Sequence, residues 1–121
     1  MSTPGALVGS VIAAPSITVS PGNQKNTISL NAAITDAEGY DLYFDTVTAQ
    51  GKQSANVITD VTFPYDHTGL SNGTAYYYTP VAWNDTSQEE SDAGTEQSGT
   101  PQAGTPPPVG DALVGGLFVI V

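Results

Sequence analysis

The sequence contains no cysteine, one histidine, one tryptophan and only two basic residues, Lys25 and Lys52. Without cysteine the chain can form no disulfide, no thiolate nucleophile and no cysteine-ligated zinc site. A single histidine leaves almost nothing from which to build a Ser-His-Asp triad or a multi-histidine metal site. Enzymes are therefore the least expected class of protein, and we predict no catalytic residue, no metal site and no cofactor.

Charge of positive sign is also scarce. The 121 residues include 12 acidic and 2 basic side chains, which gives a formal net charge of −10. Such a chain cannot neutralise phosphates, so nucleic acids are excluded as partners, and the same sign disfavours anionic membrane surfaces. No apolar run reaches the roughly 20 residues that a membrane span needs. The partners left open are other protein subunits and surface glycans.

The chain divides by composition into three segments. Residues 1–14 form a small, apolar N-terminal arm, which has no Lys or Arg ahead of its apolar stretch. We therefore do not interpret it as a secretory signal peptide, which has a positively charged start. Residues 15–101 form a domain of alternating apolar and polar residues. Residues 102–121 form a proline-rich spacer followed by an apolar C-terminal tail.

The central segment has the pattern of a β-sandwich. It is rich in turn-forming residues, since the whole chain has 13 glycines and 9 prolines. Apolar and polar residues alternate with the period of a half-buried strand in seven short stretches, at 17–19, 27–31, 40–44, 56–61, 63–68, 75–83 and between 91 and 100. This spacing predicts an all-β fold, a seven-stranded antiparallel immunoglobulin-like sandwich with extended apolar tails at both termini.

One segment of the domain carries a family resemblance. Residues 68–78 (TGLSNGTAYYY) resemble the E–F corner of a fibronectin type III domain, with Leu70 six residues before Tyr76, the spacing of that family's tyrosine corner. Residues 81–84 resemble the end of strand F, and residues 89–91 resemble the start of strand G. The resemblance covers about residues 14–101 and is to domains found in phage structural proteins and bacterial surface proteins. It implies that Tyr76 is structural, packing its ring in the core while its hydroxyl bonds upstream backbone.

The strand that contains the only tryptophan departs from the family pattern. Leu30 stands where the family usually has a core tryptophan. Alternation places Tyr77, Val81 and Trp83 on the outer face, where they form a candidate surface-binding stripe. In the alternative, Trp83 turns inward and replaces the missing core tryptophan. Pro80, in the same strand, predicts a bulge or a local break in the hydrogen-bonded ladder.

The titratable residues offer few candidate sites. His67 stands alone, with Asp66 on the opposite side of its strand, so we interpret it as a surface histidine. Oxygen-rich loops can hold Ca²⁺, but neither acidic cluster of this chain has the EF-hand spacing, so we interpret both as solvated loops. The two clusters are Asp36, Glu38, Asp41 and Asp45, and Asp85, Glu89, Glu90 and Asp92.

The two termini resemble each other. The sequence Ala-Leu-Val-Gly occurs at residues 6–9 and again at residues 112–115. Each large apolar side chain of these tails gains about 1.5–3 kcal/mol if a partner buries it. We predict that the tails dock into neighbouring subunits by strand addition or apolar insertion. The candidate assembly interface comprises Leu7, Val8, Val11, Ile12, Leu113, Val114, Leu117, Phe118, Val119, Ile120 and Val121.

These observations lead to a hypothesis about function. We expect a non-catalytic structural subunit of a larger assembly, most simply a capsid decoration protein anchored to a virion through its termini. One alternative is a subunit of an extracellular filament that assembles by strand exchange. Another is a module that binds carbohydrate or a cell surface through Tyr77 and Trp83. The expected location is a virion or an extracellular surface assembly.

Overall fold

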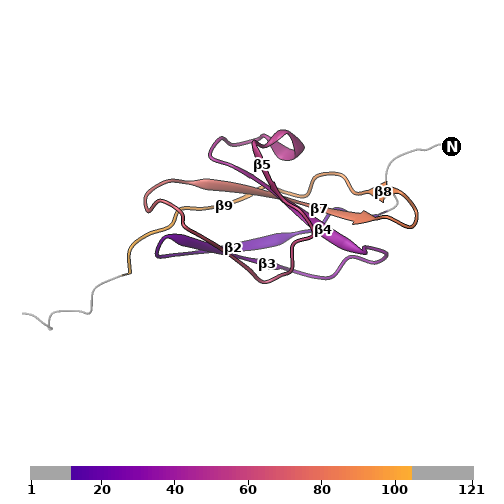
Figure 1. Ribbon diagram of the computed structural model, residues 1–121, viewed down its shortest axis with the longest axis horizontal. Helices are drawn as coiled ribbons and strands as arrows, with labels where there is room; N and C mark the ends of the chain where they lie inside the picture. The colour runs from indigo at the N-terminus through magenta and orange to yellow at the C-terminus, as the bar shows by residue number, and fades with distance from the viewer. Residues whose placement is uncertain (1–11, 105–121) are drawn as a thin grey trace, which may run out of the picture.

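Two antiparallel sheets face each other in the computed structural model, which describes residues 12–104 (Figure 1). The first sheet has the order β2 (Ile17–Gly22), β3 (Lys25–Leu30) and β6 (Tyr65–Thr68). The second has the order β5 (Asn56–Ile58), β4 (Gly39–Asp45), β7 (Tyr76–Asn84) and β8 (Glu89–Glu90), and β9 (Gln97–Gly99) also pairs with β7. A 3₁₀ turn, η1 (Gly51–Gln53), precedes β5. Among these described residues no helix is long and apolar enough to cross a membrane.

The predicted all-β antiparallel fold is confirmed, and a strand lies in each predicted stretch. Several boundaries differ from the prediction, since β5 ends at Ile58 instead of residue 61 and β6 begins at Tyr65 instead of residue 63. The first strand does not stop before Pro21 but continues through Gly22, where Pro21 lies opposite Asn26. This is tolerated because β2 is the outer strand of its sheet, where a residue without an N–H costs no ladder bond on its free side. In place of one last strand between residues 91 and 100, two short strands occur, β8 just ahead of that stretch and β9 within it.

The break expected at Pro80 explains that division. Residues 76–78 of β7 pair with β9, and residues 83–84 pair with β8. Between them, the Pro80 carbonyl accepts a hydrogen bond from the Gly94 N–H at 2.9 Å, and Ser91 bonds Ala82 through both its backbone and its hydroxyl. The ladder between β7 and β4 continues through Pro80, which lies opposite Leu42, so the predicted break occurs only on the other side of β7, where an irregular crossing segment takes the place of paired strand.

The core lies between the two sheets and follows the period-two pattern. The first sheet contributes Ile17 and Ile28, the second contributes Leu42 and Tyr78, and Val61 comes from the connection between β5 and β6. All five side chains are at most 6% exposed. Alternate residues of each strand therefore face inward and bury the apolar surface that drives folding.

The described chain begins and ends at opposite ends of the sandwich (Figure 1). Residues 12–16 lead into Ile17, which pairs with Leu30 at one end of the first sheet. At the other end, the Gln102 N–H donates to the Gly22 carbonyl at 3.0 Å. The segments on either side of the domain therefore leave it in different places.

Candidate functional site

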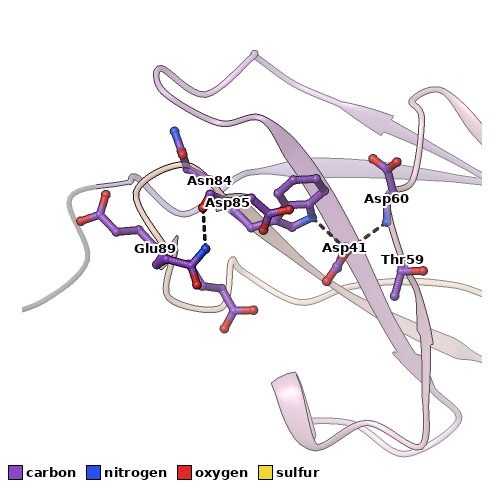
Figure 2. Close-up of a pocket in the computed structure, with 9 residues that line it drawn as sticks. Asp41, Thr59, Asp60, Asn84, Asp85 and Glu89 are labelled. Carbon is purple, nitrogen blue, oxygen red and sulfur yellow. Dashed lines mark hydrogen bonds between the residues drawn. The ribbon is translucent and has the colours of Figure 1, made fainter.

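A hollow of about 330 Å³ lies on the outer face of the second sheet, beside the only tryptophan of the chain (Figure 2). We call it the Trp83 pocket. Trp83 and Asn84 reach it from the end of β7, Asp41 from β4, and Thr59 and Asp60 from the chain after β5. Its remaining walls come from Asp85, Gln88, Glu89 and Glu90.

Trp83 is held firmly in this pocket. Its indole Nε1 donates a hydrogen bond to Asp41 Oδ1 at 3.0 Å, and the same carboxylate oxygen accepts from the Asp60 N–H at 3.0 Å. Gly39 lies directly opposite Trp83 in the sheet, and a Cβ there would come within 2.2 Å of the indole. Glycine is therefore required for the ring to cross the neighbouring strand. Of the two orientations considered, Trp83 adopts the outer one and lies outside the core cluster.

The rest of the predicted outer stripe is not an exposed surface. Val81 is 0% exposed, so its predicted availability to a partner is wrong. The cause is η1, which packs against β4 and β7, with Lys52 reaching across to Glu90 on β8 at 2.8 Å. Tyr77 is half-buried at the far end of β7 and lies opposite Asp45 and Ser98. Tyr77 and Trp83 therefore form two separate positions instead of one stripe.

The acidic side chains are divided among different structural tasks. Glu38 holds the 85–88 loop, since its carboxylate accepts from the Asp85 N–H at 2.9 Å and the Thr86 hydroxyl at 2.6 Å. The Thr86 hydroxyl, and then the two backbone N–H groups, hold the pKa of Glu38 below its usual range. Asp45 accepts from the Ala55 and Val47 N–H groups, which lowers its pKa. Within residues 12–104 no three acidic or histidine side chains are grouped so as to hold a metal ion.

The prediction of a surface histidine is wrong for His67, which is half-buried against aromatic rings. Its ring centroid is 4.4 Å from that of Phe44, and its Nδ1 lies 2.8 Å from the Tyr78 hydroxyl. That hydroxyl also accepts a hydrogen bond from Asn26 Nδ2 at 3.1 Å, so Tyr78 links His67 to Asn26. Burial lowers the pKa of His67 and raises the pKa of Tyr78 to about 12. The histidine therefore belongs to a structural network.

The network predicts that stability falls in mild acid. The pKa of His67 is lower in the folded protein than in the unfolded chain, so the unfolded chain binds a proton more readily. The free energy of unfolding therefore falls as the pH drops from about 6.5, the ordinary histidine pKa, towards the lower pKa of folded His67. The slope for one proton is at most about 1.4 kcal/mol per pH unit. Urea unfolding between pH 8 and 5 measures this slope. The variant His67→Gln should lack it, and an equal slope in both proteins would assign the effect to other groups.

The tyrosine corner has the geometry that the resemblance implies. The Tyr76 hydroxyl accepts a hydrogen bond from the Ser71 N–H at 2.9 Å. Leu70, at the start of the same turn, is 8% exposed. The pair joins the two sheets where the chain crosses from β6 to β7.

The predicted assembly residues lie almost entirely outside the described part of the chain. Ile12 is the exception, and because it is only 2% exposed within its own domain, its predicted availability to a neighbouring subunit is wrong. The others lie at 7–11 and 113–121, outside residues 12–104. Their part in assembly stays a prediction.

Comparison with solved structures decides the fold. A fibronectin III-like protein from Clostridium thermocellum superposes with a TM-score of 0.53 and 22% identity, over 78% of this chain and 99% of that one. The fold is fibronectin type III-like. A second structure, described as a myokine, has the same TM-score with 16% identity, over 74% of this chain and 97% of that one. No protein-family model matches the sequence, and no curated protein matches it.

Proposed function

We propose that this fibronectin III-like protein is a non-catalytic structural subunit of a larger assembly, attached to its neighbours by residues 1–14 and 102–121. The observation that carries the proposal is the exit of the described chain at opposite ends of the sandwich (Figure 1). A subunit with an apolar segment at each end can contact a different neighbour on each side.

Charge supports the same proposal. Copies that each carry a net charge of −10 repel one another. Residues 112–121 contain no charged side chain and end in Leu-Phe-Val-Ile-Val. This segment, like the equally uncharged residues 1–14, can therefore approach another acidic domain without charge repulsion between side chains. It also supplies the apolar surface that a stable contact needs.

The assembly we propose is a virion surface, on which the protein acts as a decoration subunit. The absence of cysteine favours this location over a secreted filament, because small secreted domains commonly depend on disulfides. The fold alone does not choose between the two, since one fold serves many functions. In the filament alternative, copies of this chain alone would build an extracellular fibre, whereas on a virion the assembled copies would also attach to the capsid surface.

Paired substitutions in the tail test the attachment. The double variant Phe118→Asp with Ile120→Asp should abolish assembly, because it puts two carboxylates into the segment that a partner would bury. A matched control, Ala32→Asp with Ala33→Asp, adds the same charge at exposed positions of the domain and should leave assembly unchanged. Light scattering measures particle size for the parent and both variants. Assembly that survives the tail substitutions would contradict the proposal.

Glycan binding is a second candidate function, which the Trp83 pocket favours. The pocket is lined by an indole ring together with carboxylate and amide groups. Concave ligand sites commonly combine an aromatic side chain with a few polar groups that orient the ligand. Because Trp83 is the only tryptophan, its fluorescence reports directly on occupancy of the pocket. Titration with a panel of glycans should give a saturable change in emission. A flat titration with every glycan would remove this candidate.

A further inference from the structure

A second hollow, of about 310 Å³, opens between the two sheets at the end where the chain enters the domain. We call it the Phe63 groove. Leu30 reaches it from the end of β3 and Tyr40 from the start of β4. Val61 and Phe63 complete its apolar wall from the connection between β5 and β6. For comparison, an apolar cavity of about 150 Å³ accommodates a benzene ring, so the groove has room for about two large side chains.

The walls of the groove are held in place before any partner arrives. The Tyr40 and Phe63 rings meet edge to face with centroids 5.7 Å apart. The Tyr40 carbonyl accepts from the Val61 N–H at 2.8 Å, and its hydroxyl accepts from the Ile34 N–H at 2.9 Å. A groove whose walls are already fixed loses little conformational entropy when it is filled.

The charge at the rim limits what can enter. Glu38 and Asp60 both lie at the edge of the groove, and the Glu38 carboxylate is already engaged by Thr86. An acidic segment would be repelled from this rim. Residues 112–121 of this protein carry no charged side chain and contain five consecutive large apolar residues at 117–121. They match the apolar wall, and their side chains carry no charge that the acidic rim would repel.

The position of the groove indicates which copy supplies that segment. The groove lies at the Leu30 end of the sandwich, whereas residues 101–104 leave at the Gly22 end. Three consecutive prolines at 106–108 are a composition that favours an extended, semi-rigid spacer. A neighbour aligned head to tail would present its tail directly at the groove. This contact is heterologous, so it propagates into rings or open polymers.

We propose that residues 117–121 of one copy insert into the Phe63 groove of the next copy. The proposal rests on the proposed function, because it names the surface that receives the tail.

Disulfide trapping tests it in the full-length chain, which has no cysteine of its own. Thr62→Cys places a thiol on an exposed residue at the groove, and Val119→Cys places one in the tail. The two single variants are mixed under mild oxidation and analysed by mass. The matched control replaces Thr62→Cys with Ser71→Cys, which is also exposed but lies near Asn72 at the Gly22 end.

We expect a covalent heterodimer from Thr62→Cys with Val119→Cys, and at least a tenfold smaller yield from the control pair. Equal yields, or none from the groove pair, would overturn the proposal. If the parent protein still forms particles by light scattering, only the receiving surface is wrong and the proposed function stands. If it forms none, both proposals fail. A third sample carries Thr62→Cys and Val119→Cys in the same chain. If this chain forms an intramolecular disulfide while the mixture of the two single variants gives no heterodimer, each tail fills its own groove and the proposal is overturned.

Discussion

Replacing Asn26 by aspartate should lower the free energy of unfolding by about 3–5 kcal/mol, the cost of an uncompensated buried charge. Asn26 is 0% exposed, and its Nδ2 donates to the Tyr78 hydroxyl and the Gly99 carbonyl, both at 3.1 Å. Aspartate has the same shape but no donor when ionised, so its carboxylate would face the Gly99 carbonyl without a hydrogen bond. The donor that Asn26 now supplies to Tyr78 would also be lost.

Urea unfolding measured against the parent at pH 8 and pH 5 checks this result. The loss should be smaller at pH 5, because a protonated carboxyl regains one donor. The control Asn56→Asp makes the same chemical change at an exposed residue of β5 and should alter stability by less than about 0.5 kcal/mol. Equal effects at both positions would contradict the buried network.

Replacing Leu42 by alanine should cost about 2–5 kcal/mol of unfolding free energy. Leu42 is 0% exposed, and it lies opposite Ile58 on β5 and Pro80 on β7, with its side chain in the core between the sheets. Truncation removes apolar contacts and leaves a cavity, because the paired strands on both sides restrict relaxation. Small domains are stable by only about 5–15 kcal/mol, so the variant should unfold at much lower denaturant.

The emission of Trp83 follows this transition. The control Val57→Ala removes apolar atoms from a side chain that is 44% exposed, and it should change stability by less than about 0.5 kcal/mol. A Leu42→Ala effect as small as that of the control would mean that the core does not lie between the sheets as described.

The strands could be predicted from the sequence because alternation is a local property. The period-two pattern located β4 and β7 within a residue or so, and Pro80 alone predicted the break that divides β8 from β9. The resemblance of residues 68–78 to the E–F corner of fibronectin type III domains implied the corner at Tyr76, again from one stretch of chain. Each of these features depends on residues that are close in sequence.

The parts that were missed depend on residues far apart in sequence. Val81 is buried on the side of the sheet where η1 packs against β4 and β7 and Lys52 reaches Glu90, and no local pattern of β7 contains these contacts. His67 is half-buried because Tyr78 and Phe44 meet it from the opposite sheet. One signal was available: Asn26 has the same parity as Ile28, so alternation places it inward. A polar residue there indicates a buried hydrogen-bonded network.

The most direct test of the central claim is the solution mass of the full-length protein, measured by light scattering beside a chain that ends at Gly104. The account predicts that the full-length protein forms particles larger than a monomer. The shortened chain should be a folded monomer with an unchanged Trp83 emission. If both proteins are monomers at the same concentrations, residues 105–121 do not join copies of this chain, and the proposed subunit contact is wrong.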